Sequence, residues 1–408
     1  MKINNQFLFK RSNQRTIYSL LLVATPFLLL QNYLQSFIGS VSGMEIRIFD
    51  YKIPVIPLLA MAIIVALVIM LRKKITVNRI AGWSVIFLMF GIGQYFTDFY
   101  FHHRFYDLQY NWHYLAYSVF AYLNYRFLKE KNADNSKILL NTFITAFFIS
   151  LFDEIIQIPL SNRIFDIGDV AKDLWGTLIG LTFVFAVIEN GKIFKNPLKL
   201  RHPGIKDYLS DELSLYFYLF LFDLLFLMFT SVLTDTKYLF QAFVFPAAVF
   251  FLLFSLVHIS QFKAGKWLTF FVVALFLTGT VFLQIKYRNK GVFPVNEHLF
   301  IYKGFPVYYL DIMIFPGGTF RPVDKKDFFN QRDKKTIKAY SQDILLVSSG
   351  TRGKGGKGFL TGRESDFVYN EYRKKGLQII VQDNFLAFKT YNRLAKEGKK
   401  ITFIIKND

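Results

Sequence analysis

Long apolar runs constrain this chain more than any other feature of its sequence. Several blocks of 16 to 24 residues carry almost no charge, and one of the clearest is IPVIPLLAMAIIVALVIML at 53–71. About 20 apolar residues in a helix cross the hydrocarbon core of a bilayer. Within lipid, only helices and closed barrels satisfy every backbone polar group. We therefore predict an α-helical multi-spanning membrane protein.

The apolar blocks predict about nine transmembrane helices. They lie near 17–37, 53–71, 80–97, 113–128, 137–158, 169–188, 213–233, 239–258 and 267–285. No small-residue cleavage site follows the first block, so we interpret it as a retained span and not as a removed signal peptide.

The net charge of +20 is explained by a membrane better than by nucleic acid. With the N-terminus in the cytoplasm, the predicted inner segments carry 19 Lys and Arg residues and the outer loops carry six. This bias is the one that the positive-inside rule expects. We predict a multi-pass protein of the cell membrane, with the lipid bilayer and its anionic headgroups as partner and no nucleic acid. An odd number of spans places the C-terminus outside the cytoplasm.

The chain divides by composition into four parts. Residues 1–190 hold six predicted spans, and 191–212 form a basic linker with two prolines. Three further spans follow at 213–287. Charged residues then return at the density of a soluble protein, so 290–408 is predicted to form a small α/β domain.

Short apolar runs define the predicted elements of this C-terminal domain. Strands are expected at 305–315 and 343–350, and ESDFVYNEYRKKG at 364–376 has helical periodicity. The remaining order is a strand at 377–383, a helix at 385–400 and a strand at 401–408. The loop GTRGKGGKG lacks the G-x4-G-K-[ST] spacing of a phosphate loop, and we predict no cofactor.

The stretch DEIIQIPLSNRIFDIGDVAKDLWGTLIG, from Asp153 to Gly180, places seven charged residues between two apolar runs. One ionisable side chain at mid-membrane costs about 2.5–3.5 kcal/mol. The seven charges must therefore pair, lie at the interface or line a wet cavity. Asp153 and Gln157 are four residues apart and share one helix face. Arg163 lies in the loop that follows, where its guanidinium can bridge carboxylates from both helices.

A second helical stripe follows the loop. Its members are separated alternately by three and four residues; they are Asp166, Asp169, Asp173, Gly176 and Gly180. The two glycines permit close helix packing below the acids.

Two interpretations of this stretch remain open: a structural clamp between two helices, or an outward-facing polar pocket that binds an envelope molecule. If the pocket is catalytic, Glu154 or Asp153 is the candidate general base and His113 the candidate acid. His102 and His103 match no standard metal spacing, so we predict an aromatic interfacial loop there and no metal site.

Asp223 and His258 lie in or near two later predicted spans. A proton relay is one interpretation. The other is a lone acid that a Tyr or Ser on a neighbouring helix satisfies.

The pattern D-E-x2-Q-x5-R-x2-D-x2-D with two spaced glycines resembles the signature of the VanZ-like family of bacterial membrane proteins, named after a teicoplanin-resistance factor. The matching positions are Asp153, Glu154, Gln157, Arg163, Asp166, Asp169, Gly176 and Gly180. WHYLAYSVFAYL is similar to the family's second signature, through His113 and Tyr117. The resemblance covers about 80–190. The family usually has Asn where this chain has Asp173, and an Asp-Lys pair where this chain has Gln109 and Tyr110.

This resemblance implies work in the cell envelope, by binding an envelope lipid or a glycopeptide-related ligand, and low-level lipoglycopeptide resistance. A membrane enzyme acting on a lipid-linked envelope precursor and a structural assembly scaffold are the alternatives. The candidate binding residues are Asp153, Glu154, Gln157, Arg163, Asp166, Asp169, Asp173, His113 and Tyr117.

The C-terminal part, about 298–408, resembles the Mth-type domain, a small α/β family that includes an adipogenesis-associated protein. TYNRLAKEGKK, from Thr390 to Lys400, is the most telling segment. This resemblance implies a binding or scaffold module with a protein partner.

Overall fold

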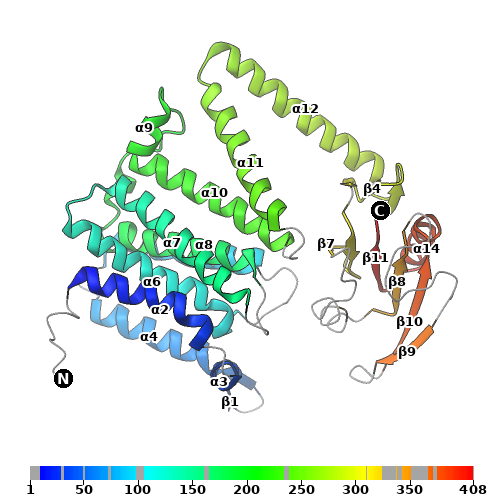
Figure 1. The fold of residues 1–408 in the computed structure, drawn as a ribbon, viewed down its shortest axis with the longest axis horizontal. Helices are drawn as coiled ribbons and strands as arrows, with labels where there is room; N and C mark the ends of the chain where they lie inside the picture. Colours follow the sequence, from blue (N-terminus) through cyan, green and yellow to red (C-terminus); the bar gives the residue numbers. More distant parts are fainter. Residues whose placement is uncertain are drawn as a thin grey trace. The chain divides into compact units, whose positions relative to one another are not determined.

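The computed structural model describes twelve stretches of the chain: 10–28, 32–48, 51–71, 75–97, 105–159, 165–233, 239–308, 310–323, residue 337, 342–350, 366–370 and 375–407. The chain divides into two compact units, shown in Figure 1. The first comprises Met1–Thr234 and Leu239–His258, and the second comprises Asp235–Tyr238 and Ile259–Asp408.

The first unit is a helical bundle with one short antiparallel hairpin. The hairpin strands are β1 (Glu45–Ile48) and β2 (Tyr51–Pro54). The helices are α2 (Arg11–Leu28), α3 (Asn32–Ser42), α4 (Val55–Leu71), α5 (Val77–Thr97), α6 (Leu108–Glu130), α7 (Asn135–Gln157), α8 (Ile167–Thr182), the π-helical turn η2 (Phe183–Ile188), the 3-10 turn η3 (Lys192–Lys195), α9 (Ile205–Ser210), α10 (Glu212–Val232) and α11 (Leu239–Ile259). In Figure 1, α2, α6, α7, α8 and α10 run side by side.

Six helices of the described chain are long and apolar enough to cross a membrane. They span Val77–Thr97, Asn135–Gln157, Ile167–Ile188, Glu212–Ser231, Leu239–Ile259 and Lys263–Tyr287. Each coincides with one of the nine predicted spans. The multi-spanning membrane class therefore rests on six candidate spans.

The full set of nine spans is not confirmed. The predicted span at 113–128 is helical, as part of α6, but α6 carries many tyrosine and amide side chains and is less apolar than the six. The predicted span at 53–71 corresponds to α4, which has only 17 residues. Of the predicted span at 17–37, the described residues belong to α2, up to Leu28, and to α3, from Asn32.

Helix α8 is the centre of the first unit. It packs against α5, α6, α7 and α10, and most of its side chains are buried. Two glycines bring its backbone against that of α6. A Cβ added at Gly176 would lie 2.8 Å from the carbonyl oxygen of His113, and one at Gly180 would lie 2.6 Å from that of Ser118. Small residues at these positions allow the two backbones to approach.

The packing of α10 and α12 shows how the predicted three-span part, 213–287, is distributed between the two units. Helix α10 contacts α5, α7 and α8 within the first unit, whereas α12 (Lys263–Tyr287) belongs to the second unit. The boundary between the units at Ile259 therefore lies within the predicted three-span part, 213–287.

The second unit contains α12 and two sheets. Strands β3 (Val292–Pro294), β4 (Leu299–Tyr302) and β5 (Phe305–Tyr308) form an antiparallel sheet. The other sheet has the order β7-β6-β11-β8-β10-β9, in which β8 runs parallel to β10 and β11. Its strands are β6 (Ile312–Ile314), β7 (Phe320–Pro322), β8 (Ile344–Ser348), β9 (Asp366–Asn370), β10 (Lys375–Gln382) and β11 (Ile401–Ile405), and helix α14 (Asn384–Lys396) packs on β8, β10 and β11.

The second unit confirms most predicted elements of the C-terminal domain and corrects two. The predicted strand at 305–315 is two strands, β5 and β6. The predicted helix at 364–376 is wrong, because Asp366–Asn370 is strand β9 and pairs antiparallel with β10. Phe, Val and Tyr in this segment favour a strand once a partner strand is present, and that partner outweighs the local helical period. Residues 351–358 of the glycine-rich loop lie outside the described residues.

Candidate functional site

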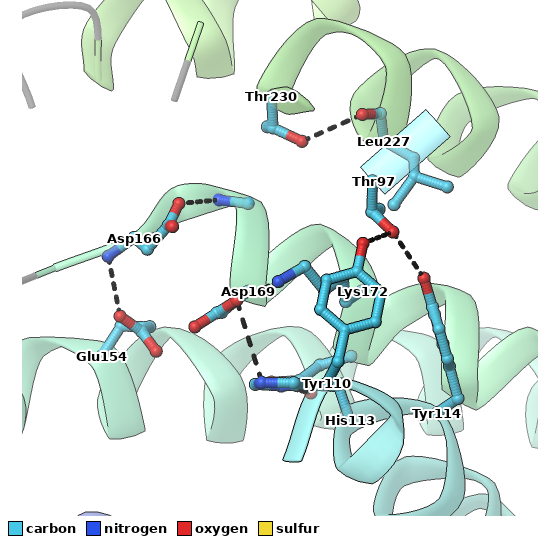
Figure 2. A network of polar contacts seen from close by, with 12 residues as sticks. Thr97, Tyr110, His113, Tyr114, Glu154, Asp166, Asp169, Lys172, Leu227 and Thr230 are labelled. Carbon is cyan, nitrogen blue, oxygen red and sulfur yellow. Dashed lines mark hydrogen bonds and ion pairs between the residues drawn. The ribbon is translucent and has the colours of Figure 1, made fainter. Parts of the chain in front are cut away.

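Most of the charged side chains of the 153–180 stretch lie close together, and Figure 2 shows Glu154, Asp166, Asp169 and Lys172 among them. They come from the C-terminal end of α7 and the N-terminal end of α8, and the N-terminal end of α6 adds a histidine. We call this group the acidic cluster; its members are Asp153, Glu154, Asp166, Asp169, Asp173, His113 and Lys172.

Asp173 forms the buried centre of the acidic cluster, with a side chain only 2% exposed. Its Oδ1 lies 2.9 Å from Nδ1 of His113 on α6, and its Oδ2 accepts a hydrogen bond of 2.6 Å from Oγ of Ser150 on α7. One carboxylate thus joins three helices. These contacts orient the His113 ring so that Nε2 lies 3.8 Å from Oδ1 of Asp169.

Asp169 and Lys172 form the more accessible edge of the acidic cluster. Lys172 Nζ lies 2.5 Å from Asp169 Oδ1, and the side chains are 14% and 27% exposed. The ammonium group also lies 5.0 Å from the ring centroid of Tyr110, a cation–π arrangement. Figure 2 shows this tyrosine continuing the polar network: its hydroxyl donates to Thr97 Oγ1, which lies 3.0 Å from the hydroxyl of Tyr114.

Glu154 links the end of α7 to the start of α8. Its Oε1 accepts a hydrogen bond of 2.9 Å from Gln157, and its Oε2 accepts one of 2.8 Å from the backbone N–H of Asp166. Asp166 in turn caps α8, because its Oδ1 accepts from the backbone N–H of Gly168. Acids at this position are stabilised by the positive end of the α8 dipole. The predicted pair of helices is thus joined at its polar end.

The structure places the other predicted residues as follows. Tyr117 is buried on α6 close to Asp173, and Asp153 is half-buried on α7. Arg163, the predicted bridge, lies outside the described residues. The helix-packing glycines Gly176 and Gly180 lie against α6, as described above.

Sequence reasoning missed two members of the network. Lys172 was part of the stretch, and its position three residues after Asp169 was the available signal, since such pairs meet on a helix. Ser150 lies one turn before Glu154 on α7, so the same spacing could have found it. Neither spacing identifies Asp173 as the partner of Ser150, because that contact joins two helices.

No group of three or more His, Asp or Glu side chains within the described stretches could hold a metal ion. His102 and His103 fall outside those stretches. The separate pair considered for a relay does not meet: His258 Nδ1 lies 3.1 Å from the hydroxyl of Tyr208 on α9, whereas Asp223 is buried in the middle of α10.

The C-terminal domain holds a buried tyrosine pair. The hydroxyls of Tyr302 and Tyr391 lie 3.3 Å apart, and burial raises the pKa of both phenols. Asn384, at the start of α14, accepts from Ser348 on β8 and donates to the carbonyl of Lys406. These hydrogen bonds hold the start of α14 at the ends of the parallel strands, so the role of Asn384 is structural.

No protein-family model matches the chain, and no curated protein and no solved structure matches it. The class of the protein therefore rests on its own features. It is a mostly helical chain with six candidate membrane-crossing helices, a polar cluster at one end of its bundle, and a strand-rich C-terminal domain.

Proposed function

We propose that this chain is a multi-pass protein of the bacterial cell membrane that binds a polar, amine-bearing envelope ligand through the acidic cluster. The observation that carries the proposal is the convergence of charge. Among the described residues, four carboxylates, those of Glu154, Asp166, Asp169 and Asp173, are joined by hydrogen bonds and ion pairs that include one lysine and one histidine. An excess of acid at a confined site attracts a cationic group. The VanZ-like resemblance supports an envelope lipid or a lipoglycopeptide-related molecule as the source of that group.

The partial exposure of the cluster supports binding over a purely structural clamp. Asp173 and Glu154 are 2% exposed and are held by protein partners. Asp169 and His113 keep 27% and 23% of their side chains exposed. The buried acids hold the helices together, while the edge at Asp169 remains open to a ligand.

Asp169→Asn is expected to weaken binding of the ligand, and with it the protection against lipoglycopeptides, while the protein still folds and inserts into the membrane. The change removes one charge at the accessible edge, and hydrogen bonds to charged groups contribute about 1.5–3 kcal/mol. We expect about a tenfold loss of affinity, equivalent to roughly 1.4 kcal/mol. Lipoglycopeptide susceptibility of cells that carry each variant is the measurement.

Two comparisons make this experiment decisive. Glu130→Gln is the control, because Glu130 lies at the other end of α6 with a side chain 58% exposed and a loose contact to Arg11 at 3.9 Å. It should leave susceptibility unchanged. Deletion of the whole gene with no change in susceptibility would rule out the resistance function.

The orientation that we propose has the N-terminus in the cytoplasm and the acidic cluster and C-terminal domain outside. The opposite end of the bundle carries basic side chains, among them Arg79, Lys129 and Lys192, as expected for a cytoplasmic face. Protease added to sealed inside-out vesicles should leave the C-terminal domain intact. Cleavage of that domain from the cytoplasmic side would overturn the nine-span topology.

An enzyme acting on a lipid-linked envelope precursor is the second candidate, and the Asp173–His113 pair favours it. A carboxylate that orients an imidazole is an arrangement used in general acid–base catalysis, and the His113 side chain is partly exposed. Both oxygens of Glu154 already accept hydrogen bonds, so His113 is the better candidate for proton transfer. His113→Gln should reduce turnover about 10²–10⁴-fold, and Glu154→Gln should reduce it less. Purified protein that leaves every envelope lipid intact would exclude the enzyme.

A further inference from the structure

Asp223 is a buried carboxyl that the acidic cluster does not include. It lies at the middle of α10, within a candidate span, and its side chain is 0% exposed. Neither of its carboxyl oxygens has a hydrogen-bond partner among the described residues. An isolated carboxylate in an apolar interior costs several kcal/mol, so the site requires an explanation.

The contacts of α10 show which way Asp223 faces. Tyr216, Asp223 and Thr230 follow one another by seven residues and so share one helix face. Tyr216 bonds through its hydroxyl to Thr182 of α8. Phe220, on the same side, packs on the Trp175 ring of α8 with centroids 5.1 Å apart. Asp223 therefore faces the interior of the bundle, toward α8.

We propose that Asp223 is a proton-binding site, held as the neutral acid in the resting protein. The ligand is a proton. It is the smallest species that can neutralise a carboxylate that has no protein cation beside it. A polar group at this depth in a span is more often functional than incidental. The site is independent of which envelope molecule the acidic cluster binds.

The titratable groups on the neighbouring helices are consistent with this assignment. Those at the end of the bundle that holds the acidic cluster are Tyr110, His113, Tyr114 and Tyr117 of α6, Asp169, Lys172 and Asp173 of α8, and Asp153 and Glu154 of α7. Lys172 is the one ammonium group in that set, and it is paired with Asp169. Arg79 of α5, Tyr208 of α9 and His258 of α11 lie at the opposite end.

The proton on Asp223 can be tested directly by infrared spectroscopy of the full-length protein in lipid. A neutral carboxylic acid has a carbonyl stretch that an ionised carboxylate lacks. We expect this band in the wild-type protein at neutral pH and its loss in Asp223→Asn, which keeps the shape of the neutral acid. Glu212→Gln, in the first turn of the same helix, is the matched control and should keep the band. A wild-type protein without the band, or one that shows it only when sodium is removed, overturns the proposal in favour of an ionised carboxylate or a cation site.

The wild-type spectrum carries the test even if Asp223→Asn fails to fold. The band should be present in the wild-type protein at neutral pH, and its absence there overturns the proposal.

Discussion

Gly180→Ala is expected to destabilise the protein strongly, with a loss of about 2–3 kcal/mol in the free energy of unfolding. The added Cβ would lie 2.6 Å from the carbonyl oxygen and 2.7 Å from the Cα of Ser118 on α6. Both are backbone atoms that cannot rotate away, so α6 and α8 must separate. Overpacking of a close-packed interior typically costs about 1–3 kcal/mol, and separation would also strain the 2.8 Å bond from Ser118 Oγ to the carbonyl of Gly176. Thermal melting of the purified protein in detergent is the measurement.

The chain offers matched controls for this glycine. A Cβ at Gly91 on α5 or at Gly279 on α12 would meet nothing within 4 Å. Both are helical, so alanine there should leave the melting temperature unchanged or raise it, since alanine exceeds glycine in helix propensity by about 1 kcal/mol. If Gly180→Ala and Gly91→Ala melt at the same temperature, α6 and α8 do not approach each other as closely as described.

Asp173→Ala is expected to cost about 2–5 kcal/mol, because it leaves two buried hydrogen-bonding groups unsatisfied, at about 1–3 kcal/mol each. The change leaves His113 and Ser150 without the carboxylate that receives them. Asp173→Asn should cost much less. Its amide oxygen can accept from His113 Nδ1 and its amide nitrogen can donate to Ser150 Oγ, so both hydrogen bonds persist.

The contrast between these two variants is the informative result. The melting temperature should be lowest for Asp173→Ala and higher for Asp173→Asn. It should be highest for the exposed control Glu130→Ala. Equal loss in both Asp173 variants would mean that the negative charge, and not the hydrogen bonding, holds the three helices together. Tolerance of alanine would mean that Asp173 does not join them.

The acidic stripe was predictable because it depends on a local property. Asp166, Asp169 and Asp173 are separated by steps of three and four, and any α-helix places such residues on one face. The same holds for Gly176 and Gly180. The partners of the stripe were not predictable from spacing. His113 and Ser150 reach Asp173 across sequence separations of 60 and 23 residues, and the choice of contacting residues depends on how α6, α7 and α8 pack.

Two other differences have the same origin. Helix α6 lies among α2, α7 and α8, so tyrosines such as Tyr114 and Tyr117 are buried by protein, and hydropathy alone is a poor guide to its role. Residues 366–370 are a strand because β10 pairs with them. In both cases a neighbour from another part of the chain outweighs the local pattern.

The sequence by itself determined the membrane-like helical class, the approximate positions of the six strongly apolar helices and the acidic and glycine stripe of α8, because hydropathy and helical period are summed over neighbouring residues. Only the tertiary structure decided that Asp173 holds His113 and Ser150, that Gly180 meets the backbone of α6, and that Asp223 faces the bundle interior. Those contacts join residues from different helices. Their geometry is set by the packing of whole helix faces, which no short window of sequence contains.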